Sequence, residues 1–431
     1  MEKYIDIKDA PKYTIKTDVL VCGGGPAGIG AALRAARMGA SVMIVEMGGC
    51  LGGIATAGMM SHWGGRSSSK IMQELFELSR ERDLGYSWCD ENRPGKNTIP
   101  HDLQMIILEE MMKKDNVKIL YYTIVSKAVM DGNKVVGVVV HNKSGESMIS
   151  AKCVIDATGD GDVAASAGVP FFLGRETDHK MQPATIMFKI GGVDYERAVF
   201  PHSFETLVET QKGELQSLGK KHLPFPAGHV LLYRQPEPDT VCVNMTNAIG
   251  VDGTNAESVT EAVLTCRSQI MPIIEFLREY APGYEKCWLM SSASLIGIRE
   301  TRHFEGVASL NTEDILSAKI YPDWVVKRAY FNFDVHNMTG SSLDKTGVQK
   351  HFTQKNDYSI PYGCLLPRDV EGLLLSGRNI SGSHLAHSNF RIMSVCMALG
   401  EAAGAAAAIA VDKGKLLRKV DVKLIQEVVG E

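Results

Sequence analysis

The sequence of 431 residues predicts an α/β fold, in which a parallel sheet with helices and a β-meander is interrupted by an inserted α+β domain. Three glycine-rich turns support this fold, each between an apolar strand and a helix, in segments 17–46, 153–168 and 372–404. The third turn repeats the pattern of strand, glycine-rich turn and helix after a long segment that lacks it. We therefore predict an N-terminal extension at 1–16, a discontinuous first domain formed by 17–169 and 356–431, and an inserted substrate domain at 170–355.

The first turn has the residue pattern of a dinucleotide-binding unit. It follows an apolar strand at 18–22, and Gly23, Gly25 and Gly28 fill the glycine positions of GxGxxG. The first glycine allows a tight turn, and the second lets the backbone approach a pyrophosphate, which the N-terminus of the next helix attracts. Glu46 stands near the roughly 20-residue spacing at which an acidic residue binds a ribose diol. The segment therefore predicts a dinucleotide site on a Rossmann-like unit.

The other elements follow from hydrophobic periodicity and turn residues. We expect an edge strand at 4–7 and helices at 71–83 and 102–114, where apolar residues recur every three or four positions. Apolar segments bounded by turns such as DGN and KSGE predict further strands, and the insertion adds two strands and a long helix. The expected strands are 41–45, 117–121, 124–130, 134–141, 147–150, 152–155, 230–234 and 241–245, and the long helix is 258–279.

Composition favours an ordinary soluble protein. The chain is 45% hydrophobic and 22% charged, with a net charge of -4, and it has no cluster of Lys and Arg that would suit nucleic acid. The N-terminal residues lack an apolar signal core, and the apolar segment 393–411 contains Glu401 among many Ala and Gly, which favours a buried helix over a membrane span. The nine cysteines form no CxxC pair. We therefore expect reduced thiols, a cytoplasmic location and no metal.

The second glycine-rich turn is a further candidate for ligand contact. Its small residues at 157–159 let a ligand approach the backbone closely. Asp156, Asp160 and Asp162 in this turn could be metal ligands, but no His or Glu joins them. The glycine spacing instead favours a turn with helix capping.

The order of these motifs resembles a known family. GGGPAG, GGCLGGIATAG, AKCVIDATGDGDVA, GIRETR, IPYGCLLP, GLLLSGRN and ALGEAAGAAAA follow one another as in the bacterial FAD-dependent oxidoreductases of the glutathione-reductase-like flavoprotein superfamily, over about residues 15–412. The resemblance implies FAD as the cofactor and an oxidoreductase activity. Two positions depart from the family: Arg378 stands where many members have Asp, and His303 stands where Arg is common.

The resemblance also implies which residues contact FAD. The first turn would hold the pyrophosphate, Glu46 the adenosine ribose and Val125 the adenine, and a helix start near Ile392 would direct its N–H groups at the flavin. The expected cofactor-binding residues are Gly23, Gly25, Pro26, Ala27, Gly28, Glu46, Met47, Gly52, Gly53, Thr56, Val125, Ala157, Thr158, Gly159, Asp160, Gly377, Arg378, Asn379, Met393 and Ser394.

Because FAD performs the redox step, the protein must place a substrate and move one proton. The candidates for catalysis are His336 and His384 as proton carriers, and Arg302 and Arg391 as partners of a substrate carboxylate or an enolate. His62, His387 and Arg299 are further candidates. Each histidine could instead be structural, and the arginines could form internal ion pairs, for example with Glu300 or Glu305.

Three functions remain open at this stage. The first is hydride transfer between FAD and a small polar substrate such as a hydroxy acid, sugar acid or amine, with oxygen, a quinone or a protein as acceptor. The second is a flavin-binding electron-transfer subunit, and the third is a tRNA-modifying flavoprotein, which the net charge of -4 disfavours. The sequence has no second GxGxxG motif followed by an acidic residue, so nothing in it indicates a nicotinamide-binding domain. We expect a small-molecule substrate and neither nucleic acid nor membrane as partner, and a homo-oligomer is allowed.

Overall fold

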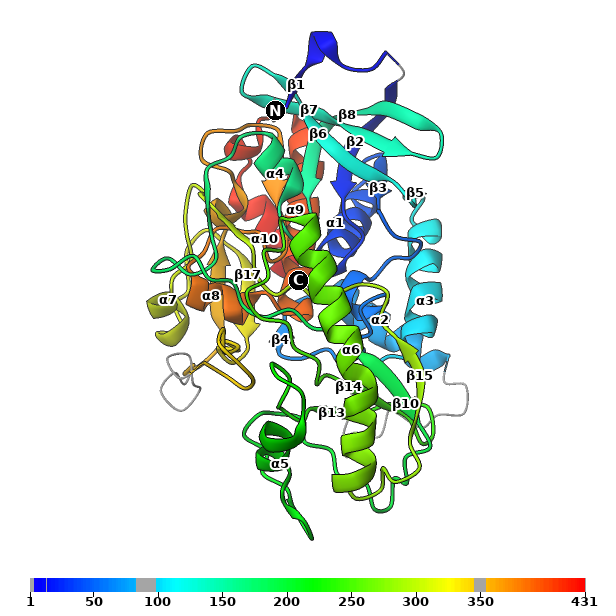
Figure 1. Cartoon of the computed structure of the whole chain (residues 1–431). Coiled ribbons are helices and arrows are strands. Elements are labelled where there is room, and N and C mark those ends of the chain that lie inside the picture. Colours follow the sequence, from blue (N-terminus) through cyan, green and yellow to red (C-terminus); the bar gives the residue numbers. More distant parts are fainter. Residues whose placement is uncertain (1–3, 13, 83–97, 345–353, 431) are drawn as a thin grey trace.

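The computed structural model describes residues 4–12, 14–82, 98–344 and 354–430. Its largest sheet has the order β1-β6-β7-β8-β2-β3-β5, with β19 also paired to β8 (Figure 1). The pairs around β2 and β8 are parallel except for the antiparallel meander β6-β7-β8, as the sequence predicts. The strands are β1 (Ile5–Asp6), β2 (Thr14–Cys22), β3 (Val42–Val45), β5 (Lys118–Leu120), β6 (Ile124–Asp131), β7 (Lys134–Asn142), β8 (Gly145–Asp156) and β19 (Leu373–Leu375).

One strand prediction is wrong. Segments 147–150 and 152–155 were expected as separate strands, but both belong to the single strand β8. β7 pairs with β8 from Gly145 to Ser150 and β2 pairs with it from Met148 to Asp156, so the two ladders overlap and Ala151, opposite Thr17, lies within the ladder with β2. No turn separates the two segments, because the ladder with β2 runs through Ala151.

Two helices made largely of small residues pack on this sheet. In α1 (Pro26–Arg37) and α9 (Met393–Lys413), a Cβ on Gly30 would lie 2.3 Å from the Met397 carbonyl oxygen, and one on Gly400 would lie 2.0 Å from that of Ala27. The backbones therefore touch directly, which only glycine permits here. By length and composition α9 could cross a membrane, yet 94% of its most apolar window is buried inside the protein. A buried core helix is the structure that the sequence predicts.

Glu401 in the middle of α9 joins three elements. Its carboxylate accepts hydrogen bonds from the Arg34 guanidinium at 2.5 Å, the Ser69 hydroxyl at 2.5 Å and the Ile71 backbone N–H at 3.1 Å. Ser69 and Ile71 lie at the N-terminus of α2 (Lys70–Glu81), so Glu401 links α9 to α1 and also satisfies a donor of α2. The predicted end of that helix, residue 83, lies outside the described residues.

We expect Glu401→Ala to lower the free energy of unfolding by about 3–5 kcal/mol, because it leaves the Arg34 charge without its partner inside the core. Urea denaturation followed by circular dichroism measures this change. The control is Glu427→Ala at an exposed position of α10 (Val422–Gly430), where we expect a change within about 0.5 kcal/mol. Equal midpoints for the two variants would contradict the role given to Glu401.

A second sheet lies beside the first and has its own hydrophobic core. Its order is β13-β14-β10-β15, all antiparallel, and α6 runs along it in the lower half of Figure 1. Its apolar residues, among them Phe188, Ile274 and Tyr284, form a cluster separate from that of the large sheet. The elements of this part are β10 (Phe188–Gly191), β11 (Glu209–Thr210), β12 (Gly213–Glu214), α5 (Leu215–His222), β13 (Leu232–Arg234), β14 (Val241–Val243), α6 (Ala256–Tyr280) and β15 (Trp288–Ser292).

The last part of the predicted insertion packs with the first core. Phe304, Val325 and Phe333 belong to the same hydrophobic cluster as the large sheet and α9. Strand β17 pairs with β18 and with β4, and β16 pairs with β9. The domain limits at 170 and 355 stay a prediction. The remaining elements are η1 (Ile7–Asp9), η2 (Gly53–Ala55), β4 (Arg66–Ser67), α3 (His101–Lys114), α4 (Asp162–Ser166), β9 (Phe171–Leu173), β16 (Arg302–Phe304), α7 (Thr312–Leu316), β17 (Trp324–Tyr330), β18 (Tyr358–Pro361), η3 (Tyr362–Leu365), α8 (His384–Phe390) and η4 (Leu417–Lys419).

Candidate cofactor and substrate site

The first glycine turn lies directly against the second. Gly23 has φ +103°, and a Cβ there would lie 2.4 Å from the Ala157 carbonyl oxygen. A Cβ on Gly28 would lie 1.9 Å from the carbonyl oxygen of Gly23 itself. A Cβ on Gly25, by contrast, would meet no described atom within 4 Å, although Gly25 is the N-cap of α1. The space in front of the helix N-terminus is therefore open, as a pyrophosphate requires.

Glu46 is fixed at the end of β3, beside this space. One carboxylate oxygen accepts from the Gly24 N–H at 2.7 Å and the other from the Gly48 N–H at 2.7 Å. Next to it, Met47 is 61% exposed and Tyr122 is 71% exposed, with the Tyr122 N–H bonded to the Gly48 carbonyl at 3.1 Å. A carboxylate flanked by exposed apolar side chains fits a ribose with its adenine. Tyr122 has no sequence motif that marks it, and its positive φ of 50° is visible only in the structure.

The third turn joins the second through a partly buried ion pair. The Arg378 guanidinium lies 2.7 Å from the Asp160 carboxylate, which also accepts from the Thr301 hydroxyl at 2.6 Å. A Cβ on Gly377 would lie 2.9 Å from that of Ala27, so this turn lies beside the start of α1. Arg378, in the position where the family often has Asp, is therefore paired with an acid from the second turn. Burial and the Asp160 charge act on Arg378 in opposite directions, and its pKa stays above the ordinary value.

The aspartates of the second turn are engaged within the protein. Burial raises the pKa of Asp156 to about 6, although Thr158 and the Ala164 backbone N–H donate to its carboxylate. Asp162 pairs with Arg302 at 2.9 Å. These contacts agree with the capping interpretation of this turn, and they place Arg302 beside the second turn.

The predicted flavin side is formed by two further segments. Gly53 has φ +54°, and a Cβ there would lie 3.1 Å from the Gly25 Cα, so the Gly52–Thr56 turn lies on the first glycine turn. The α9 helix starts after Ile392, as predicted. Ser394 in its first turn donates to the Gly64 carbonyl at 2.8 Å and accepts from Ser67 at its own carbonyl. Segments far apart in the sequence thus converge around the N-terminal ends of α1 and α9.

A cluster of charged residues and histidines lies next to the start of α9. The Arg391 guanidinium donates to the carboxylate and the carbonyl of Asp334, both at 2.9 Å, and Nε2 of His336 lies 3.3 Å from the same carboxylate. Although burial would raise it, the positive charges around Asp334 hold the pKa of this carboxyl below its ordinary value. Burial, reinforced by Arg299, lowers the pKa of His336 to about 4. Near neutral pH the cluster therefore holds an ionised Asp334 beside a neutral His336.

Several buried polar atoms around this cluster have no partner. Among the described residues, Nε of Arg391, Nδ1 of His229 and Nε2 of Gln182 accept or donate no hydrogen bond. His229 and His336 contact the same ring, that of Phe204, each at 5.1 Å between centroids. Gln182 accepts from the His336 backbone N–H at 3.1 Å. Because buried polar groups are normally satisfied, their gathering here fits a polar ligand bound at this place.

His384 lies in a different, adjacent cluster. Its Nδ1 is 2.6 Å from the Glu300 carboxylate, which also lies 2.8 Å from Nε2 of His303. Gln182 connects the two clusters, since its backbone N–H donates to Glu300 at 3.1 Å. The structure thus brings His336 and Arg391 together at Asp334. His384 lies in the neighbouring cluster, at Glu300, and Arg302 pairs with Asp162 at the second turn. Sequence reasoning missed Asp334, Gln182 and His229, which have no motif of their own.

The comparisons with known proteins identify the family of the chain. The sequence profile of a family described as FAD dependent oxidoreductase matches residues 18–429, so the chain belongs to that family. FAD is its cofactor and it is an oxidoreductase. The narrower resemblance to glutathione-reductase-like flavoproteins stays a prediction, as do the individual FAD contacts. No curated protein matches the sequence.

Solved structures share the fold at low sequence identity. A geranylgeranyl bacteriochlorophyll reductase-like protein from Thermoplasma acidophilum is 15% identical, with a TM-score of 0.50, over 96% of this chain and 82% of that chain. The p-nitrophenol 4-monooxygenase PnpA from Pseudomonas putida DLL-E4 is 12% identical, with a TM-score of 0.50, over 97% and 84%. The flavin-dependent brominase Bmp2 is 14% identical, with a TM-score of 0.50, over 96% and 83%. These likenesses support the fold.

Proposed function

We propose that this protein transfers a hydride between FAD and a small polar organic substrate that has a carboxylate or a similar anionic group. The observation that supports this most is the contact of His336 and Arg391 with Asp334, directly before the start of α9. A hydroxy acid or a sugar acid is the substrate class that such a site would suit, and an amine is the alternative. FAD, when bound, supplies the two-electron acceptor or donor.

His336 is the proposed proton carrier. Its Nε2 faces an ionised carboxylate, so this nitrogen holds the ring proton and Nδ1 keeps a lone pair. In the oxidation of an alcohol, the substrate oxygen would lose its proton to Nδ1 while the hydride leaves the adjacent carbon, so that a carbonyl forms. In the reverse direction, the same nitrogen would return the proton. Asp334 holds the ring in this tautomer and stabilises it once it is charged.

Arg391 and Arg299 are the proposed anion-binding residues. Both are nearly enclosed, and Arg299 donates to the Pro183 carbonyl at 2.5 Å. Burial, followed by the charge of Arg391, lowers the pKa of Arg299 to about 10, which leaves it protonated at neutral pH. Two guanidinium groups with one aspartate between them leave a net positive charge, which a substrate anion would neutralise.

The test is the visible spectrum of the purified protein, mixed without oxygen with pools of hydroxy acids, sugar acids, neutral sugars and amines. We expect the flavin absorbance to bleach with an anionic pool and to persist with neutral sugars. Bleaching by neutral sugars alone would contradict the role of the arginines. Absence of bleaching by every pool, together with a stable copurifying protein, would instead support an electron-transfer subunit.

A further inference from the structure

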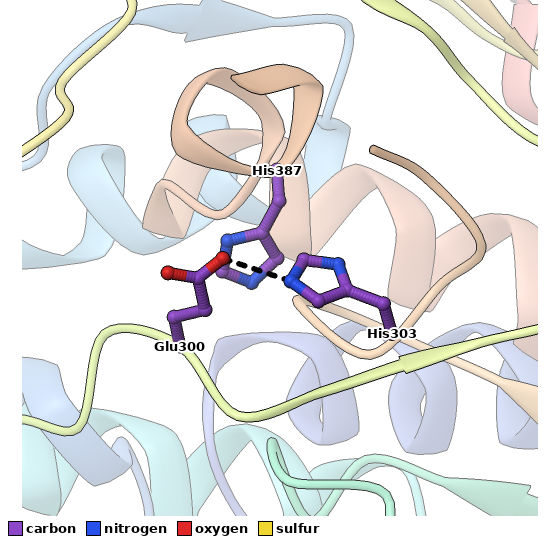
Figure 2. Close-up of side chains that lie close together, drawn as sticks. All are labelled: Glu300, His303 and His387. Atoms are coloured by element: carbon purple, nitrogen blue, oxygen red, sulfur yellow. Dashed lines mark hydrogen bonds and ion pairs between the residues drawn. The ribbon is translucent and has the colours of Figure 1, made fainter. Parts of the chain in front are cut away.

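A compact group of metal-ligating side chains lies beside the proposed substrate site. Glu300, His303 and His387 each offer one ligand atom, and these atoms lie within 4.8 Å of one another; Figure 2 shows the three side chains close together. The three side chains are almost completely buried, each at 1% exposure. Glu300 lies just before β16 and His303 lies within this strand, whereas His387 comes from α8.

The hydrogen bonds of His303 leave Nε2 of its ring facing the Glu300 carboxylate. Nδ1 lies 3.1 Å from the carbonyl oxygen of Gly382, which can only accept, so the proton of the neutral ring is on Nδ1. Nε2 then has a lone pair, and it lies 2.8 Å from a carboxylate oxygen of Glu300. An additional proton on Nε2 accounts for this contact, and a metal ion held beside the two atoms could take the place of that proton.

His387 provides the second, independent observation. Its Nδ1 is buried and has no hydrogen-bond partner among the residues that the structure describes. The His387 ring stands nearly perpendicular to that of His303, with centroids 4.9 Å apart. An additional proton on His303 gives Nδ1 of His387 no partner, whereas an ion bound by all three side chains would also engage His387.

The surroundings have the features of a supported metal site. A ligating histidine usually donates its other N–H to a carbonyl or carboxylate, as His303 does to Gly382. Glu300 is held by the Gln182 backbone N–H and by His384. The ring of His303 also stacks on Phe172, with centroids 4.9 Å apart. These contacts fix the orientation of the ligands before any ion binds.

We propose that Glu300, His303 and His387 bind one divalent transition-metal ion. Two imidazoles and one carboxylate suit Zn²⁺ or Fe²⁺ rather than Mg²⁺ or Ca²⁺, which prefer oxygen ligands alone. Gln182 links the cluster to the proposed substrate site, since it contacts both Glu300 and His336. An ion bound by Glu300 would therefore help to hold Gln182 in position beside His336.

The experiment uses the FAD-loaded protein. After treatment with a chelator it is dialysed against Zn²⁺, and bound zinc is measured by mass spectrometry and by X-ray absorption. We expect about one zinc per chain, with nitrogen and oxygen ligands that include imidazole. His303→Ala and His387→Ala should each weaken zinc binding by about 100-fold or more. The control is His101→Asn, since His101 is also buried with both ring nitrogens unpartnered but lies outside the cluster.

Several results would contradict the metal site: no zinc retained by the wild type, a sulfur ligand in the absorption spectrum, or equal zinc binding by the wild type and both variants. If an alanine variant loses its FAD spectrum, the corresponding glutamine variant, His303→Gln or His387→Gln, is measured in its place. The X-ray absorption spectrum of the wild type then decides whether imidazole binds the zinc. Neither readout depends on activity, so failure of the metal proposal is distinct from failure of the proposed hydride transfer.

Discussion

Gly25→Val is expected to give a folded protein that no longer binds FAD. Gly25 has an extended backbone (φ -73°, ψ -176°) that valine adopts, and its Cβ would meet no described protein atom within 4 Å. The added side chain would instead fill the space in front of α1, where the N–H groups would bind the pyrophosphate. We expect the Kd for FAD to rise by at least about 100-fold, corresponding to roughly 2.7 kcal/mol. Titration of the apoprotein with FAD, followed by flavin fluorescence, measures it.

The neighbouring glycine gives a matched contrast. A Cβ on Gly28 would lie 1.9 Å from the Gly23 carbonyl oxygen, so Gly28→Val should destabilise the fold itself. The two variants therefore separate loss of the cofactor from loss of structure. If Gly25→Val purifies yellow with full occupancy, the assignment of the first glycine turn to FAD is wrong.

The second large effect is expected for His336→Asn, which should slow flavin reduction by about 10²–10⁴-fold and leave the FAD spectrum intact. Asparagine keeps a polar group near Asp334 but has no nitrogen that can accept the substrate proton. Rapid mixing without oxygen, followed at the flavin absorbance, measures the step. His101→Asn replaces a buried histidine elsewhere and should retain the wild-type rate. An unchanged rate in His336→Asn would remove His336 from the mechanism.

The pH dependence of the same step provides an additional check on His336. A base must be neutral to accept a proton, and burial lowers the pKa of His336 to about 4. When the substrate is oxidised, the rate of flavin reduction should therefore be constant from about pH 5 to 8 and should fall as the pH drops through about 4. A rate that falls already near the ordinary histidine pKa would indicate a different base or a more exposed ring.

Much of the cofactor side of the molecule could be predicted from the sequence because its signals are local. Gly23, Gly25 and Gly28 lie within one turn, and the following acid is fixed by the length of one helix and one strand. The small residues of α9 likewise predict a buried helix, and the structure adds that its backbone touches that of α1. In each case one short segment contains both the signal and the element that it specifies.

The substrate side could be predicted only in part. His336 and Arg391 were found as chemically capable residues, but Asp334, which joins them, had no pattern that distinguished it from other aspartates. The division of β8 into two strands failed for a related reason, since the ladder with the distant strand β2 continues through Ala151, where the sequence suggested a break. Pairing partners distant in the sequence leave no mark on local periodicity.

The sequence by itself determined the class of fold and the dinucleotide motif, because backbone conformation and close approach require particular residues at particular spacings. FAD and the oxidoreductase family came from the resemblance of its motifs to a known family. Only the tertiary structure decided that His336 and Arg391 share Asp334, that Arg302 pairs beside the second turn, and that Glu300, His303 and His387 meet in the interior. The physical reason is that side-chain chemistry depends on burial and on neighbours that the fold supplies from distant segments. A local motif specifies the backbone conformation of one segment. The packing of separate segments specifies which charged and titratable side chains lie next to one another.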